Sequence, residues 1–526
     1  MVNQRINFKT EKELQEAVLR EKIKGTPDLE IGQKYGVTFK YIERLITRTH
    51  GLNISALTRL GGTKKIKTLY PKDFKDEQTT VWSFKQRGNW ATHSGEYRGN
   101  WSPYIPRNVI LKYSKPAELV LDYFCGAGTT AVECKLLGRK CIAFDINDKA
   151  IELANKNISF SVEPQQLTLT DEKSHLKVYE PELSVGDARD LSFLKDNSID
   201  LICAHPPYAN IIHYTDSKEA DLSFNDINEF LKEMSKVAKE SFRVLRPGKQ
   251  CAILIGDTRR KKHVIPLGFK LVNVYLDAGF KLRELIIKRQ HNCKTTGFWY
   301  ANSIKYNFLL LAHEYLPIFE KPKTPFPLSL RERGIDYGLL VPTLEKPLLK
   351  RKLDELETTT VWIMPEKDFE KRLNKNVIDR YSNGDGYLTI TFMSHSENEA
   401  CFFEKRRGKK KGLLFIKSPF LNNSPSHSDV EHYLKETKEI VNRELPNISK
   451  GGFLVIQTQD ARIDGYIEPL SKRIVDTLTT YDLWLREIVV VTQKEQGSEI
   501  QTSSEYLKIS HQYLLVYEKT KGDKNE

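Results

Sequence analysis

The stretch from Leu119 to Asp145, LVLDYFCGAGTTAVECKLLGRKCIAFD, decides the fold. It opens with an apolar run of strand length, Leu119 to Phe124, turns through two glycines, and continues from Thr129 with residues at helical spacing. A second apolar run ends at Asp145, and a second helix is expected from Lys149. Strand, helix and strand in this order predict a βαβ unit of a parallel sheet.

The turn between that strand and its helix is typical of sites that bind a nucleoside. It reads DYFCGAGTTA from Asp122 to Ala131, with a G-x-G-x-x-A pattern that starts at Gly126. Glycines let the backbone approach a ligand closely. Asp145 ends the next strand, where a carboxylate can accept both hydroxyls of a ribose. Alone, the turn predicts a nucleoside cofactor and leaves a nicotinamide dinucleotide open.

Four later apolar runs predict further strands: Ser198–Ala204, Cys251–Asp257, Leu282–Lys288 and Phe308–Glu320. Strands that alternate with helices predict an α/β fold with a doubly wound, mostly parallel sheet. A stretch rich in proline and lysine follows, so residues 323–349 are predicted to form a linker.

A second motif stands directly after one of these strands. His205, Pro206, Pro207 and Tyr208 follow Ala204, at the carboxyl edge of the sheet, where such folds bind ligands. Together with the glycine turn, this motif resembles the amino-methyltransferases of DNA, whose paired motifs are FxGxG and (D/N/S)PP(Y/F). The resemblance covers residues 79 to 320, so 79–322 is the expected catalytic domain. The segment Trp101 to Arg107 resembles one that helps to hold the cofactor in that family.

This resemblance implies a Rossmann-like methyltransferase that moves a methyl group from S-adenosylmethionine to adenine N6 or cytosine N4 in double-stranded DNA. A cognate restriction endonuclease is the partner that such an enzyme often has. The cofactor site implied by the resemblance consists of Asp122, Phe124, Gly126, Gly128, Thr129 and Thr130 around the methionine part, Asp145 at the ribose and Asp187 at the adenine amine.

The chemistry explains the residues of the second motif. An exocyclic amine is a poor nucleophile until acceptors hold its protons, and residue 205 with the carbonyl of Pro206 would be those acceptors. The prolines stiffen the loop, and Tyr208 offers a ring on which a flipped base can stack. His205 departs from the family pattern. A neutral imidazole accepts one hydrogen bond, so activity is predicted to fall below about pH 6.5 unless burial shifts the pKa. A histidine that only packs is the alternative.

The second half of the chain repeats parts of the first in the same order. TTVW at 79–82 recurs at 359–362, and Asp257 and Pro266 correspond to Asp460 and Pro469 with their spacing preserved. The glycine turn and the His-Pro-Pro-Tyr motif do not recur, since the latter place reads KSPF at 417–420. Residues 350–520 are therefore predicted to be a degenerate methyltransferase-like domain, acting as an internal pseudo-dimer or a DNA-gripping surface. An unrelated α/β domain remains the alternative.

Three further segments are candidates for contact with DNA. Residues 1–60 are predicted to be helical, and Asp28–Tyr35 with Phe39–Thr49 would form a helix-turn-helix or an ordinary helical hairpin. The insertion Arg289–Asn307 mixes basic, amide and aromatic residues, which suits base recognition or a plain surface loop. The basic run Lys405–Lys411 suits a phosphate contact or a solvated loop.

Composition limits the remaining choices. The 82 Lys and Arg outnumber the 69 Asp and Glu, and the formal net charge of +13 favours a polyanionic partner, although a merely basic enzyme fits as well. Seven cysteines without a C-x-x-C pair indicate neither a disulfide framework nor a metal site. Without a signal peptide or a membrane-length apolar run, a cytoplasmic protein is expected. Methylation of RNA or a protein amide, and a non-catalytic nucleic-acid-binding role, stay open.

Overall fold

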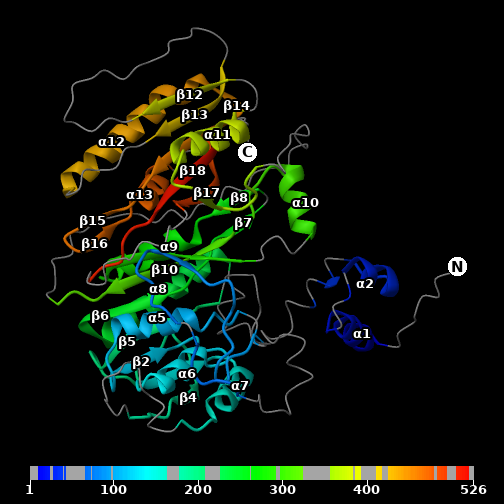
Figure 1. Cartoon of the computed structure of the whole chain (residues 1–526), viewed down its shortest axis with the longest axis vertical. Coiled ribbons are helices and arrows are strands. Elements are labelled where there is room, and N and C mark those ends of the chain that lie inside the picture. Colours follow the sequence, from blue (N-terminus) through cyan, green and yellow to red (C-terminus); the bar gives the residue numbers. More distant parts are fainter. Residues whose placement is uncertain are drawn as a thin grey trace.

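The computed structural model describes residues 10–23, 26, 28–38, 41–42, 45, 66–72, 74–95, 97, 99–162, 177–207, 226–260, 262–291, 297–323, 356–382, 386–391, 410–417, 425–478, 482–493 and 505–520. Two sheets dominate this part of the chain, one in each half, and Figure 1 shows them one above the other along the longest axis. Within the described helices, none is long and apolar enough to cross a membrane.

The first sheet has eight strands. In spatial order they are β1 (Val81–Ser83), β9 (Lys281–Arg289), β10 (His313–Glu320), β6 (Leu245–Ile253), β5 (Ile199–Ala204), β2 (Leu119–Asp122), β3 (Lys140–Asp145) and β4 (Glu182–Val185). All neighbouring pairs are parallel except those of β10, which runs against both β6 and β9. This confirms the predicted α/β fold with a mostly parallel, doubly wound sheet.

The chain changes direction across the sheet at β2. From β2 it moves outward to β3 and β4, and then returns to the other side of β2 to form β5. The carboxyl ends of β2 and β5 are therefore neighbours whose following loops diverge. Folds of this kind bind ligands at such a switch point.

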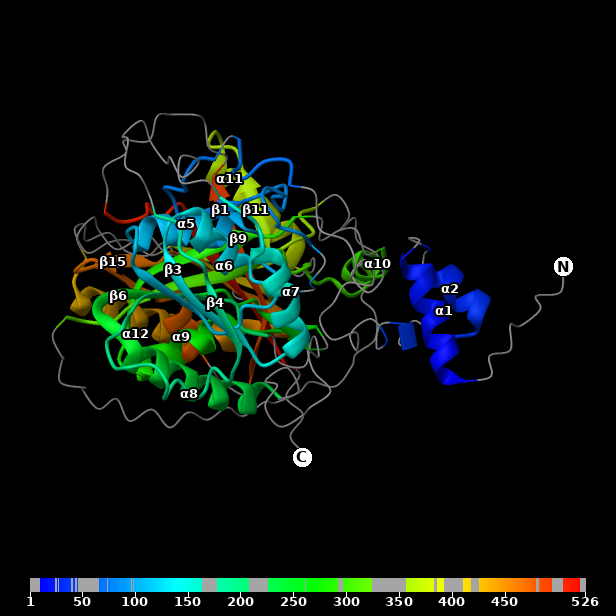
Figure 2. The ribbon, with the colours of Figure 1, turned by 90° about the horizontal axis from the view of Figure 1, so that it is seen from below.

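Helices cover both faces of the first sheet, as Figure 2 shows from below. On one face lie α5 (Tyr104–Tyr113), α6 (Thr129–Leu136) and α7 (Asp148–Ile158); on the other lie α8 (Ile227–Val244) and α9 (Leu267–Asp277). The sequence of α8 explains its position, because Phe230, Met234 and Val237 recur at helical spacing and are fully buried. Asp226 caps α8 by accepting a hydrogen bond from the Glu229 amide at 2.9 Å.

The second sheet repeats the order of the first as far as it goes. It runs β11 (Val361–Met364), β17 (Leu483–Gln493), β18 (His511–Lys519), β14 (Ile448–Thr458), β13 (Lys411–Lys417) and β12 (Tyr387–Thr391), and β18 is again the antiparallel strand. Helix α11 (Phe369–Tyr381) covers one face, and α12 (His427–Glu444) and α13 (Leu470–Thr477) cover the other. The short 3-10 helix η5 (Leu445–Asn447) follows α12. Among the described residues, nothing corresponds to β3 and β4.

Each half reaches into the other through a small hairpin, and the two hairpins make matching contacts. In the first half β7 (Thr258–Arg260) and β8 (His263–Ile265) lie against β17, and in the second half β15 (Ala461–Ile463) and β16 (Tyr466–Glu468) lie against β9. Arg259 pairs with the buried Glu487, and Arg462 pairs with the buried Glu284.

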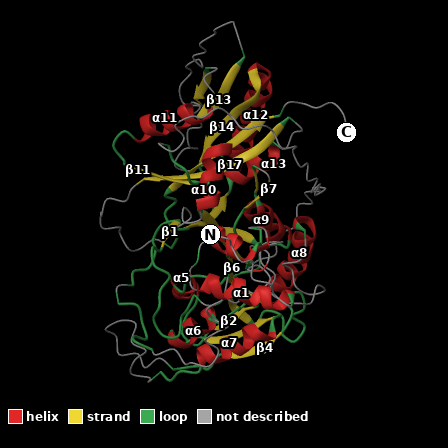
Figure 3. Cartoon of the chain, turned by 90° about the vertical axis from the view of Figure 1, so that its right-hand side faces the viewer, coloured by secondary structure: helices red, strands yellow, loops and turns green. Residues whose placement is uncertain are grey.

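A second matching pair of contacts ties the first strands of both halves to their last strands. The Thr80 hydroxyl lies 2.9 Å from Nδ1 of His511, and the Thr360 hydroxyl lies 2.9 Å from Nδ1 of His313. One continuous apolar core joins the α8–α9 layer with the α12–α13 layer. The two halves are therefore packed together as one body, which Figure 3 shows from the side.

Three of the described helices lie apart from the two sheets and from the helices that cover them. Helices α1 (Glu11–Ile23) and α2 (Asp28–Tyr35) pack through Val18 and Ile31, and α10 (Gly297–Tyr306) lies in the predicted insertion. The first helix of the predicted helix-turn-helix is thus present. Most of the expected recognition helix lies outside the described residues, as do residues 324–349 of the predicted linker and residues 405–409 of the basic run.

Two predicted strands have different bounds in the structure. The run Phe308–Glu320 was expected to be one strand, but β10 begins only at His313. Residues before it cross to the other half instead: Leu310 exchanges two 2.9 Å backbone hydrogen bonds with Thr358 and Thr360. The strand expected at Cys251–Asp257 is β6, which begins at Leu245 and ends at Ile253, because it pairs with β5 from Leu245 onward.

Candidate active site

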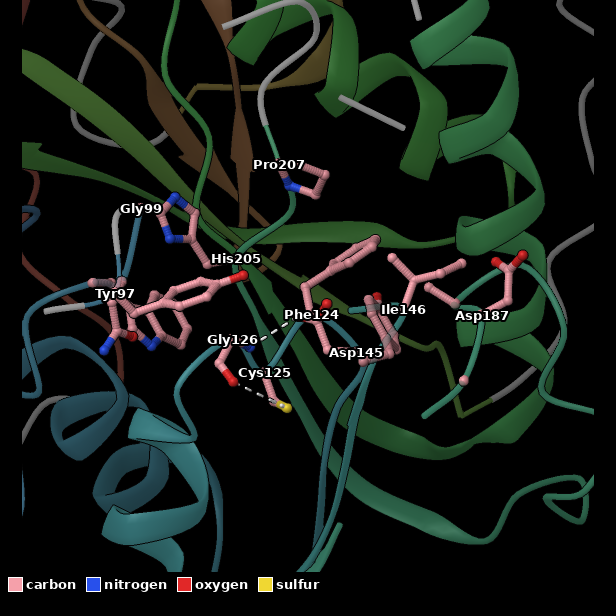
Figure 4. Close-up of a pocket in the computed structure, with 15 residues that line it drawn as sticks. Tyr97, Gly99, Phe124, Cys125, Gly126, Asp145, Ile146, Asp187, His205 and Pro207 are labelled. Atoms are coloured by element: carbon pink, nitrogen blue, oxygen red, sulfur yellow. Dashed lines mark hydrogen bonds between the residues drawn. The ribbon is translucent and has the colours of Figure 1, made fainter. Parts of the chain in front are cut away.

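A cavity of about 670 Å³, partly open to solvent, lies at the switch point between β2 and β5. The residues that line it come from four strand ends and from one loop before α5: Tyr97, Gly99, Asn100, Trp101, Tyr123, Phe124, Cys125, Gly126, Asp145, Ile146, Gly186, Asp187, Ala188, His205 and Pro207. In Figure 4, His205 and Asp187 lie on opposite sides of Phe124 in the cavity.

The structure brings together half of the residues that the sequence singled out. Phe124, Gly126, Asp145, Asp187, His205 and Pro207 line the cavity. Asp122, Gly128, Thr129, Thr130 and Pro206 are buried behind its wall. Tyr208 lies outside the described residues. Sequence reasoning missed Tyr97 and Asn100, which carry no motif signal. Trp101 in the same loop begins the predicted cofactor-holding segment.

The glycine turn is joined directly to Asp145. The Gly126 amide donates to Oδ2 of Asp145 at 2.9 Å, and the Asn147 amide donates to Oδ1 at 3.0 Å. Gly126 has a left-handed φ of +49°, and a Cβ there would lie 2.9 Å from the Tyr97 ring. Each carboxylate oxygen can accept a second hydrogen bond, as a pair of ribose hydroxyls requires. Glycine is therefore needed at 126 for both conformation and space.

The residues behind the wall support the turn. Asp122 accepts a hydrogen bond from the Phe124 amide at 3.1 Å, and its burial, with Asp145 nearby, raises its pKa to about 7. Gly128, with φ +79°, lets α6 approach α7, because a Cβ there would lie 3.0 Å from the Cβ of Ala154. The Thr129 hydroxyl donates to the Asn100 side chain at 2.6 Å and so ties the turn to the loop at the cavity.

A buried carboxylate fixes that loop. Glu133 on α6 is fully buried and accepts hydrogen bonds from Trp90 at 2.7 Å and Arg107 at 2.8 Å, and it pairs with His93 at 2.7 Å. Burial would raise the pKa of Glu133, but Arg107 and His93 outweigh it and hold the pKa below its ordinary value. These contacts fasten the residues on both sides of Tyr97–Trp101 to the helix that follows the glycine turn.

Asp187 stands at the far end of the cavity and is held by an arginine. Nε and Nη2 of Arg189 donate to its two oxygens at 3.0 and 2.6 Å, and Nη1 of Arg189 bonds Glu233 at 2.7 Å. A carboxylate held by a two-pronged arginine keeps a fixed orientation and still has lone pairs for another donor. It is therefore suited to accept from an amine such as that of adenine.

His205 stands at the opposite end, against an aromatic ring. The rings of His205 and Trp101 are stacked, with centroids 5.6 Å apart and an angle of 21° between planes. Burial lowers the pKa of His205 to about 4, although nearby Glu314 and a hydrogen bond with the Gly99 backbone act in the opposite direction. The imidazole is therefore neutral at pH 7. Loss of activity was predicted below about pH 6.5 unless burial shifts the pKa of His205. Because burial lowers this pKa, the loss is now expected only near pH 4.

Comparison with known proteins agrees with this geometry. A family model described as DNA methylase matches residues 34–156 and 199–399, more than half of the chain. The chain belongs to the DNA methylase family. A second model, described as a methyltransferase domain, matches residues 114–265 and so includes the cavity residues from Tyr123 to Pro207.

Individual relatives match shorter parts of this chain. A type II methyltransferase of Methanothermobacter thermautotrophicus is 30% identical over 155 residues, which are 26% of this chain and 43% of that protein. A tRNA (guanine(10)-N2)-dimethyltransferase of the same species is 29% identical over 113 residues, 21% of this chain and 29% of that protein. The chain thus spans less than half the length of these relatives. A solved methyltransferase of Methanosarcina mazei has a TM-score of 0.28 at 18% identity, with 41% of this chain and 98% of that one covered.

Proposed function

We propose that this DNA methylase transfers a methyl group from S-adenosylmethionine to an exocyclic amino group of double-stranded DNA, either adenine N6 or cytosine N4. One observation carries the proposal: a single cavity joins a carboxylate end suited to a nucleoside with a His-Pro-Pro end suited to an amine. Family membership supports the same reaction.

The cavity fits the cofactor at the end that holds Asp145 and Asp187. Gly126 lets the Tyr97 ring lie against the glycine turn at this end, since a Cβ at residue 126 would come within 2.9 Å of that ring. Asp145 would hold the ribose hydroxyls and Asp187 the adenine amine, and Phe124 would lie between them and the His205 end. When bound, S-adenosylmethionine supplies an electrophilic methyl group on a sulfonium.

The other end of the cavity prepares the target amine. The carbonyl of Pro206 and one ring nitrogen of neutral His205 would accept hydrogen bonds from the two N–H groups of the amine, which localises its lone pair. Trp101 holds the imidazole by stacking, and the two prolines keep the carbonyl aimed. Tyr208 would stack on the flipped base. In this proposal His205 acts on the base and does not merely pack.

The experiment is nucleoside analysis by mass spectrometry of DNA, total RNA and protein from a methylation-free host that expresses the chain. New N6-methyladenine or N4-methylcytosine in DNA would support the proposal and identify the base, and adenine is our expectation. The matched control carries Pro207→Ala with Tyr208→Ala and should leave DNA unmodified. Methylated RNA or a methylated protein amide together with unmodified DNA would overturn the proposal. A wild-type protein that does not bind S-adenosylmethionine would favour a non-catalytic role.

The wider context forms part of the same proposal. We place the catalytic domain at residues 79–322 and the pseudo-dimeric second half at 350–520, supported by the matching Arg259–Glu487 and Arg462–Glu284 pairs. A cytoplasmic setting and a cognate restriction endonuclease suit a type II methyltransferase. Co-expression with a candidate nuclease would test the last point, because methylated DNA should resist cleavage.

A further inference from the structure

Helix α10 follows a strand whose carboxyl end lies at the same edge of the first sheet as the cavity. It follows β9, and β9 runs parallel to β6 and β5 because β10 is antiparallel to both β6 and β9. The end of β9 at Arg289 and the end of β5 at Ala204 therefore share one sheet edge. Figure 2 shows α10 on the side of the molecule that faces α1 and α2.

The carboxyl end of α10 is held by an arginine of the second half. Nη2 of Arg486, on β17, donates to the carbonyls of Tyr306 at 2.9 Å and Asn307 at 3.0 Å. Arg486 is only 3% exposed and is itself paired with Glu518 at 3.1 Å. The last carbonyls of a helix have no partner within the helix, and a cation at that end stabilises it.

The residues that leave α10 are fastened to the second half as well. The Leu309 amide donates to Oε1 of Glu487 at 2.9 Å, and Leu309 lies in the apolar core of the second half. The Phe308 ring lies 5.1 Å from the guanidinium of Arg259, which also pairs with Glu487. The second half therefore fixes where α10 ends.

Positive charge surrounds this end of α10. Lys305 and Arg260 are exposed, and the Lys262 ammonium lies 5.4 Å from the Tyr306 ring. Residues 258–263 and 285–307 contain no aspartate or glutamate. The nearest carboxylates, Glu487 and Glu518, are already paired with Arg259 and Arg486, so the exposed cations at this helix end can complement a phosphate backbone.

We propose that the second half is a scaffold for DNA binding, in which Arg486 positions α10, the helix after β9, to contact the phosphate backbone of the duplex. This inference rests on the proposed DNA substrate and adds the surface that meets it. Arg486 is a positioning residue: it touches neither cofactor nor base. The degenerate half thus contributes to the affinity for DNA through a helix that belongs to the catalytic half.

The chain offers a matched control for Arg486. Arg283 occupies the corresponding place on β9: it bonds Glu320 at 2.8 Å and Glu505 at 3.0 Å, and its guanidinium lies 4.8 Å from the Tyr506 ring. It also donates to the Glu505 carbonyl at 3.4 Å, as Arg486 does to Asn307. Arg283→Met removes a similar set of contacts without touching α10.

The test compares the Kd for duplex DNA and the steady-state constants of the full-length wild type, Arg486→Met and Arg283→Met. Arg486→Met should raise the Kd and the KM for DNA about tenfold, while kcat and the KM for S-adenosylmethionine stay within about twofold. Arg283→Met should leave the DNA constants unchanged, and Arg486→Lys should restore part of the affinity. Equal behaviour of the two methionine variants would overturn the inference.

Two further measurements keep the outcome clear. If Arg486→Met does not fold, Lys305→Glu takes its place, since an exposed side chain can change without loss of the fold; unchanged DNA affinity in that variant would overturn the inference. If the wild type binds duplex DNA without methylating it, the proposed reaction fails, while a loss of binding in Arg486→Met still supports the scaffold. If the wild type does not bind duplex DNA, both proposals fail.

Discussion

Among the described residues, the two halves have sheets with the same strand order, but the ligand cavity is lined by the first half alone. The second sheet keeps the strand order of the first from β11 to β12, and β12 stands where β2 stands in the first half. In the first half, β3 adds Asp145, and the loop after β4 adds Asp187, beside the glycine turn that follows β2. The ligand cavity therefore uses strands on both sides of the switch point. The contacts between the halves use the strands at the opposite end of each sheet.

The contact between the halves is nearly symmetric. Thr80 with His511 corresponds to Thr360 with His313, and Arg462 with Glu284 corresponds to Arg259 with Glu487. Substitutions at matched positions can therefore separate what the halves share from what only the first half does.

The largest effect is expected at the two buried ion pairs. Glu284→Leu and Glu487→Leu each leave an arginine without its carboxylate, and each should lower the free energy of unfolding by about 3–5 kcal/mol. Both carboxylates are almost fully buried, at 0% and 1% exposure. Denaturant titration of the purified variants measures the loss. A loss confined to one of the two variants would break the symmetry of the comparison.

An intermediate effect is expected at two glycines with left-handed backbone. Gly126→Ala combines strain at φ +49° with a clash against Tyr97, whereas Gly451→Ala has φ +74° and open space around the new methyl group. Both should lose about 1–2 kcal/mol of stability from backbone strain. Only Gly126→Ala should also weaken S-adenosylmethionine binding, by about tenfold or more, measured by isothermal titration calorimetry. Equal cofactor affinity in both variants would show that the turn does not contact the cofactor.

The smallest effect concerns pH. The place of His205 is taken in the second half by Lys417, whose ammonium pairs with Glu370 at 2.8 Å. Because burial lowers the pKa of His205 to about 4, the imidazole stays neutral as pH falls through 6.5 and becomes protonated only near 4. Activity should therefore be level from pH 7 to about pH 5, apart from losses shared with His205→Asn. A decline centred at pH 6.5 in the wild type, absent in His205→Asn, would contradict the burial of this ring.

Sequence patterns predicted the βαβ unit well because each of its signals is local. The apolar runs that became β2 and β3 are bounded by a glycine turn, and α6 begins at Thr129 as expected. The start of β10 was missed because an apolar residue such as Leu310 looks the same whether its backbone pairs with β9 or with the other half of the chain.

The candidate site was predicted in part for the same reason. Motifs gave Gly126, Asp145 and His205, but exposure to the cavity depends on tertiary packing, which placed Asp122 and Thr130 behind the wall. Tyr97 and Asn100 were missed because no local pattern marks a loop that reaches the cavity through its attachment to Glu133. The lowered pKa of His205 depends on burial beside Trp101, which the sequence alone does not reveal.

The bond between Thr80 and His511 has a consequence for how the chain is made. These residues are separated by most of the chain, and β18, the last of the described strands, lies between β14 and β17 inside the second sheet. Contacts between distant residues close late, because the entropy of the intervening loop must be overcome first. Until β18 has been synthesised, the second sheet has a gap in its middle and Thr80 lacks its contact with His511, so the two halves lock only after that strand is made.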